Sequence, residues 1–105
     1  MDSHRWLLFF LLIGLSYMKI DRVLLTNILN VLLNNDNLYM TITDLSAQLD
    51  IRSDEAIERL NGHLLILEDL GYAKRHETNK ERIRLTYSGY EALPELGVHD
   101  IVYLN

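Results

Sequence analysis

The chain has 105 residues, of which 49% are hydrophobic and 24% are charged, and its formal net charge is −5. This length accommodates one domain with a modest core and excludes two ordinary domains, and the composition is that of a globular rather than a disordered protein. The absence of cysteine excludes disulfides, thiol nucleophiles and cysteine metal ligands.

An unbroken apolar run extends from Trp6 to Leu15 near the start of the chain. It is shorter than the ~20 residues that a membrane-spanning helix needs, and no small-residue cleavage site follows it. Three interpretations stay open for residues 1–17. They form a helix buried against the domain or a partner subunit, a membrane-surface or targeting segment, or an upstream extension if translation starts at Met18. We expect a cytoplasmic protein without a membrane partner.

Residues 20–34 predict the first helix of the domain. Hydrophobic residues recur there at three- and four-residue spacing and form one broad stripe for burial, namely Ile20, Val23, Leu24, Ile28, Val31 and Leu32. The Asn-rich stretch at 34–37 ends this helix, because short polar side chains compete for backbone hydrogen bonds. Residues 38–42 then predict a short strand that pairs beside a later hairpin.

Two further helices, separated by a tight turn, are predicted between Thr43 and Gly71. Thr43 is a suitable N-cap for the first and Ser53 for the second, because their hydroxyls accept hydrogen bonds from free backbone N–H groups. Gly71 ends the second helix, since glycine adopts the left-handed conformation at low cost. The stripe expected to be buried on the second helix comprises Ala56, Ile57, Leu60, Leu64 and Leu67.

Residues 72–85 predict a β-hairpin with basic strands. Hydrophobic and basic residues alternate along its second half, so one face packs on the helices and the other displays charge to solvent. The tip is supplied by residues 78–81. Thr86 caps a last short helix that carries Tyr90 and Leu93 inward. Residues 94–105 form a C-terminal extension whose apolar stretch fits an extra strand or a dimer contact.

The two halves of this region carry opposite charge. Between residues 41 and 71, seven acidic residues face two basic ones, which gives a local balance of −5. Between residues 72 and 86, five basic residues face two acidic ones, which gives a balance of +3. Nucleic-acid-binding proteins are more often basic, because phosphate contacts supply much of their affinity. The hairpin therefore favours DNA binding, and the preceding helix opposes it.

Two motifs resemble bacterial winged helix-turn-helix regulators. Residues 63–75 resemble the end of a recognition helix and the first wing strand, and residues 82–93 resemble the second wing strand with its Leu-Thr-x-x-Gly signature. The resemblance covers about residues 19–93 and extends to the MarR, ArsR and PadR groups and to small phage or prophage proteins. It implies an α+β fold, mainly α with a small β-hairpin. A winged-helix domain is expected at 18–93, with an added apolar N-terminal helix.

The resemblance implies a transcriptional regulator that binds double-stranded DNA as a homodimer. In such proteins one helix enters the major groove, where arginine suits guanine and asparagine suits adenine, while the wing contacts phosphates. The recognition-helix candidates are Arg52, Ser53, Arg59, Asn61 and His63. The wing candidates are Lys74, Arg75, Lys80, Arg82 and Arg84.

An alternative function is that of a protein-interaction module with an acidic face. Such a module would inhibit a host nucleic-acid-binding protein by occupying its basic site, as a phage anti-defence protein does. The residues of this face are Asp50, Asp54, Glu55, Glu58, Glu68 and Asp69.

No enzymatic activity is expected. The chain has no Gly-rich phosphate loop, no His-Glu-x-x-His and no Gly-x-Ser-x-Gly motif. Its four histidines are scattered without metal-ligand spacing. We therefore expect no catalytic residue, no cofactor and no metal ion.

Overall fold

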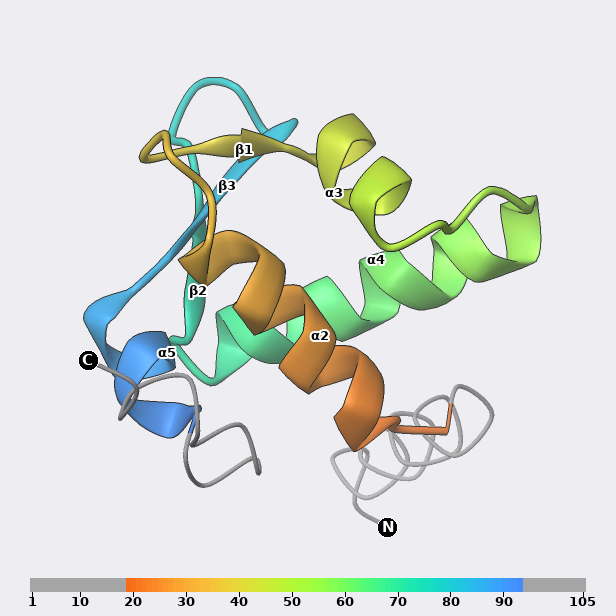
Figure 1. Ribbon diagram of the computed structural model, residues 1–105, viewed down its shortest axis with the longest axis horizontal. Helices are drawn as coiled ribbons and strands as arrows, with labels where there is room; N and C mark the ends of the chain where they lie inside the picture. The colour runs from red at the N-terminus through yellow and green to blue at the C-terminus, as the bar shows by residue number, and fades with distance from the viewer. Residues whose placement is uncertain (1–18, 94–105) are drawn as a thin grey trace, which may run out of the picture.

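The computed structural model describes residues 19–93, which fold into four helices and a three-stranded antiparallel sheet (Figure 1). The predicted segments 1–17 and 94–105 lie outside the described residues. In chain order the elements are α2 (Arg22–Leu33), β1 (Met40–Thr41), α3 (Ile42–Gln48), α4 (Asp54–Asp69), β2 (Ala73–Arg75), β3 (Arg82–Leu85) and α5 (Tyr87–Ala92). The fold is therefore mixed, with several helices and one small sheet, which agrees with the α+β class.

The first helix starts at a side-chain cap. The Asp21 carboxylate accepts hydrogen bonds from the backbone N–H groups of Val23 and Leu24, at 2.9 and 3.1 Å. The buried face of α2 consists of Leu25, Ile28, Leu29 and Leu32. The stripe predicted from spacing was wrong at its N-terminal end, because Ile20 and Val23 are 52% and 68% exposed.

The helices α3 and α4 also begin at hydroxyl caps. The Thr41 hydroxyl accepts from the backbone N–H of Asp44 at 3.1 Å, so the N-cap predicted at Thr43 was wrong by two residues. The cap predicted at Ser53 is confirmed, since its hydroxyl accepts from the N–H of Ala56 at 3.1 Å. The turn between the two helices contains Asp50 in the left-handed backbone region, with φ of +57°.

Strand β3 lies between β1 and β2 in the sheet. The predicted strand at 38–42 is confirmed in its two residues Met40–Thr41, with Met40 opposite Ile83. Buried side chains on the inner face pack toward the helices, and Ile83 has no exposed surface. Side chains alternate along a strand, so Thr41, Lys74, Arg82 and Arg84 share the outer face.

The core joins the helices to the inner face of the sheet, and Figure 1 shows the sheet at one end of α2 and α4. Its fully buried hydrophobic side chains are Ile28, Leu29, Leu45, Leu60, Leu64, Leu67, Ile83 and Leu93. Gly71 ends α4 with φ of +80°, as predicted. Thr86 caps α5, also as predicted. Tyr90 does not point inward as expected, because it is 38% exposed and stacks on Tyr87.

Candidate functional site

The solvent face of α4 is acidic. One side of the helix is buried through Leu60, Leu64 and Leu67. The exposed side carries residues at three- and four-residue spacing, which are Asp54, Glu58, Asn61, Leu65 and Asp69, with Glu55 beside them. No lysine lies between residues 54 and 69, and the only arginine there is Arg59. Leu65 is 59% exposed in the middle of this face. The solvent face of α4, the helix predicted from the sequence to meet DNA, therefore carries negative charge.

Arg59 is directed toward α2. Its guanidinium donates to the Asp21 carboxylate at 3.0 Å, in an ion pair whose side chains are 43% and 37% exposed. The pKa of Asp21 is lowered from 3.8, chiefly by the hydrogen bond from the Leu24 N–H, with the Val23 N–H and Arg59 contributing and partial burial opposing. Because its charge is shared with this carboxylate, Arg59 links two helices within the domain.

His63, one of the recognition-helix candidates, is buried rather than exposed on α4. Its ring has no exposed area. Nδ1 lies 2.8 Å from the carbonyl oxygen of Arg59, and Nε2 accepts a hydrogen bond from the backbone N–H of Asp21 at 2.9 Å. A carbonyl only accepts, so the proton is on Nδ1 and the ring is neutral in this arrangement. Both ring nitrogens are hydrogen-bonded within the domain, so neither is free to contact DNA.

The turn before α4 keeps one accessible cation. Arg52 pairs with Asp50 at 3.0 Å, but their side chains are 83% and 80% exposed, and an ion pair this exposed contributes little. The Ser53 hydroxyl is engaged by its capping bond. Arg52 and Asn61 are therefore the recognition-helix candidates that remain available to a partner.

The outer face of the sheet is basic. Lys74 is opposite Arg84 across the β2–β3 pair, and Arg82 lies two residues before Arg84 on β3. The Arg84 guanidinium donates to the carbonyl of Leu85 at 3.3 Å, and none of these three cations pairs with a carboxylate within residues 19–93. The strands place no acidic side chain on this face.

Arg75 lies on the opposite, inner face and stabilises the hairpin. Its Nε contacts the Glu68 carboxylate at 3.2 Å, and its Nη1 donates to the carbonyl of Lys80 at 2.9 Å. The side chains of Arg75 and Glu68 are only 20% and 25% exposed. Arg75 and Glu68, both predicted site residues, thus join the hairpin to α4, while the Lys80 side chain stays exposed at the hairpin tip.

An aromatic contact beside the basic face was missed by the sequence analysis. The rings of Tyr39 and His76 meet edge to face, with centroids 5.0 Å apart. The backbone N–H of His76 donates to the carbonyl of Arg82, which extends the hairpin ladder by one residue. Side chains two residues apart along a strand lie on the same face. The spacing of Tyr39 and Thr41 was therefore the sequence signal that could have placed Tyr39 beside the basic outer face.

Within residues 19–93, no group of three or more histidine or acidic side chains is placed to hold a metal ion. Over the same residues, no helix has the length and apolar character required to cross a bilayer.

Comparison with known proteins gives no relative from which function can be transferred. No protein-family model matches the chain, and no curated protein or solved structure matches it significantly.

Proposed function

We propose that the chain is a winged helix-turn-helix protein that binds double-stranded DNA through the outer face of its sheet. The order helix, strand, helix, helix and hairpin supports the winged-helix assignment, as does the sheet order β1-β3-β2, in which the first strand pairs with the second strand of the hairpin. The tight turn from α3 to α4 also fits the winged-helix topology.

The basic outer face carries the proposal. Lys74, Arg82 and Arg84 present three cations on one surface, and no carboxylate neutralises them within residues 19–93. Cations that neutralise phosphates release condensed counterions, which supplies sequence-independent affinity. The guanidinium groups also match phosphate geometry through paired hydrogen bonds.

The acidic helix constrains how DNA docks. Asp54, Glu55 and Glu58 are exposed in the first turns of α4, where they would face the phosphates lining a groove. The proposed docking therefore places the sheet against the backbone and leaves the N-terminal half of α4 outside the groove. Since phosphate contacts carry no sequence information, we expect strong salt dependence and weak discrimination between sequences.

The test is fluorescence anisotropy with mixed-sequence and upstream-promoter duplexes over a series of salt concentrations. The double variant Lys74→Gln and Arg84→Gln is expected to reduce the slope of log affinity against log salt by about two. The matched control, Lys19→Gln and Arg22→Gln, removes the same charge from exposed positions outside the sheet. Equal slopes for both pairs, or no binding at low salt, contradict the proposal.

A second candidate function rests on the free carboxylates of α4. Asp54, Glu55 and Glu58 make no ion pair with residues 19–93, whereas Asp50 and Glu68 are paired with arginines. An exposed acidic face of this kind suits a basic protein partner that otherwise binds nucleic acid. The variant Glu55→Lys and Glu58→Lys should lose a basic partner recovered by pull-down. Retention of that partner by the variant argues against this function.

A further inference from the structure

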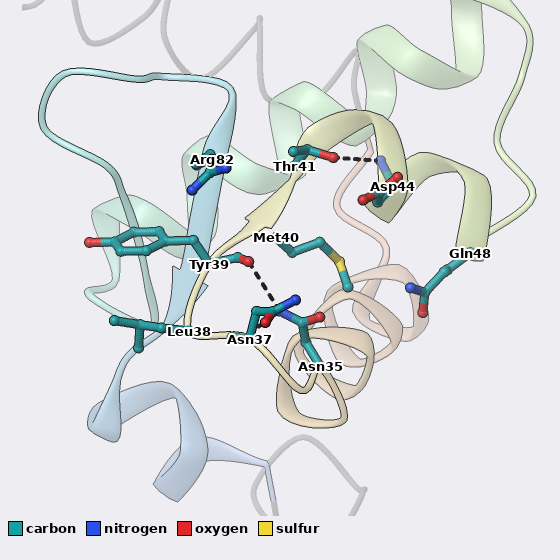
Figure 2. Close-up of a pocket in the computed structure, with 9 residues that line it drawn as sticks. All are labelled: Asn35, Asn37, Leu38, Tyr39, Met40, Thr41, Asp44, Gln48 and Arg82. Carbon is teal, nitrogen blue, oxygen red and sulfur yellow. Dashed lines mark hydrogen bonds between the residues drawn. The ribbon is translucent and has the colours of Figure 1, made fainter.

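A polar pocket lies between the α2–β1 turn, α3 and β3 (Figure 2). Its volume is about 480 Å³, which is within the range of small-molecule sites. The lining residues are Asn35, Asn37, Leu38, Tyr39, Met40, Thr41, Asp44, Gln48 and Arg82. The pocket is distinct from the acidic face of α4 and shares Thr41 and Arg82 with the outer face of the sheet.

The backbone around this pocket is fixed by internal hydrogen bonds. The Asn35 amide donates to the carbonyls of Asn37 and Tyr39, at 2.6 and 3.3 Å, which holds the turn after α2. Strand pairing holds Thr41 opposite Arg82, and the Thr41 hydroxyl caps α3. A wall that is ordered before binding loses little entropy when a ligand arrives.

Groups of opposite charge line two sides of the pocket. Arg82 projects from β3, whereas Asp44 and Gln48 come from α3, where a four-residue spacing places them on one side of the helix. The side chains of these three residues make no hydrogen bond or ion pair with one another or with any other residue between 19 and 93. A cation and an anion thus line one pocket without neutralising each other.

Apolar surface at the rim completes the pocket. Leu38 is 71% exposed there, whereas the Met40 side chain is buried in the core, with 4% of its surface exposed. A ligand that satisfied Arg82 and Asp44 would therefore also meet the hydrocarbon of Leu38. An inorganic anion would engage Arg82 alone and leave the Asp44 carboxylate close to a like charge.

We propose that this pocket binds a free α-amino acid with a large apolar side chain. The ligand carboxylate receives paired hydrogen bonds from the Arg82 guanidinium, the ammonium group donates to the Asp44 carboxylate, and the side chain covers Leu38. Because the pocket is open to solvent, the charged contacts are partly screened and millimolar affinity is expected. This inference does not depend on DNA binding.

The experiment is an NMR titration of the full chain, following backbone amides without DNA. The probes are L-phenylalanine, N-acetyl-L-phenylalanine, which lacks the ammonium group, and L-phenylalaninamide, which lacks the carboxylate. We expect L-phenylalanine to shift amides at 35–48 and 81–83, and each analogue to bind about tenfold more weakly. No shift of these amides at millimolar L-phenylalanine overturns the proposal. Equal affinity for the acetylated analogue also overturns it, since that result identifies an anion site.

Substitutions test whether Arg82 and Asp44 supply the two charged contacts to the ligand. Arg82→Gln and Asp44→Asn are each expected to weaken L-phenylalanine binding about tenfold or more, since each removes one charged hydrogen-bond partner. Lys74→Gln is the control, because it removes a cation from the same sheet face but outside the pocket. Loss of binding in the control to the same extent, or retention in both pocket variants with spectra that show a folded protein, contradicts the assignment.

Discussion

At the scale of single residues, His63 joins α2 to α4 through a neutral ring. Its Nε2 accepts from the backbone of Asp21 while its Nδ1 proton is held by the carbonyl of Arg59. Replacement by leucine preserves an apolar side chain of similar size but leaves the Asp21 N–H without its partner. We expect His63→Leu to lower the free energy of unfolding by about 2 kcal/mol, measured by urea denaturation.

The control for this prediction is Asn61→Ala on the same helix. Asn61 is exposed and two residues away, so its replacement is expected to change stability by less than about 0.5 kcal/mol. If His63→Leu is equally neutral, the buried ring packs without contributing through its hydrogen bonds.

Asp21 gives the domain a defined response to acid. Hydrogen bonds from Leu24 and Val23 and the charge of Arg59 lower the pKa of its carboxyl from 3.8 in the folded state. A group with a lowered folded pKa stabilises the fold fully above its unfolded pKa, and this stabilisation is lost as pH falls through the folded value. The free energy of unfolding, measured from neutral to acidic pH, should therefore decline more steeply for the natural chain than for Asp21→Asn. Asparagine retains the cap without the charge, so parallel curves for the two proteins would assign the acid response to other groups.

At the scale of elements, two glycines have different physical roles. A Cβ on Gly89 would lie 2.8 Å from Leu85 Cδ1 and 2.9 Å from the carbonyl carbon of Tyr72. The Tyr72 carbonyl cannot move freely, because it accepts from the N–H of Thr86 at 3.0 Å. Gly71 has nothing within 4 Å of a Cβ, but its φ is +80°.

Alanine substitutions should separate these roles. Gly89→Ala forces α5 away from the hairpin and is expected to cost about 3 kcal/mol in chemical denaturation. Gly71→Ala introduces only the left-handed penalty, about 1 kcal/mol. Ser88→Ala, at an exposed position next to Gly89, is the matched control and should be near neutral. A smaller loss for Gly89→Ala than for Gly71→Ala would show that α5 moves without cost.

Hydrophobic patterns in the sequence predicted some of these elements better than others. Periodicity located α2, α4 and the hairpin, because each has a strong hydrophobic pattern. It selected the wrong N-terminal edge of α2, since apolar residues such as Val23, Leu24 and Leu25 are consecutive there and no spacing chooses among them. The face is chosen by tertiary contacts, including the bond between Asp21 and His63.

The cap prediction at Thr43 failed although the residue type was suitable, because the strand partner of Thr41 was unknown from the sequence. Thr41 and Thr43 are both good caps, and strand pairing of Thr41 places it at the start of α3. The basic character of the hairpin was visible in the sequence. That Arg59 pairs with Asp21, and Arg75 with Glu68, depends on contacts 38 and 7 residues apart along the chain. Spacing alone does not reveal such pairs.

At the scale of the whole molecule, charge is separated by element. The exposed face of α4 is acidic and the outer face of the sheet is basic. The molecule therefore carries one acidic and one basic surface, although its net charge is −5. Ion pairs within the domain increase this separation of charge. Arg59 and Arg75 are paired with carboxylates, whereas the hairpin cations that are unpaired within residues 19–93 point outward. This distribution supports the proposed mode of DNA binding, in which the sheet leads.

The variant Glu55→Gln and Glu58→Gln separates this docking mode from insertion of α4 into the groove. If the sheet leads, these two carboxylates lie away from the phosphates, and charges separated by more than the Debye length of about 10 Å at 0.1 M salt are largely screened. We then expect the DNA affinity at that salt concentration to change by less than about twofold, with an unchanged salt slope. Insertion of α4 would bring both carboxylates against phosphates, so their neutralisation would raise the affinity about tenfold or more. Such a gain, measured by anisotropy beside the Lys74→Gln and Arg84→Gln pair, would retain DNA binding as the function and reject the sheet as the leading surface.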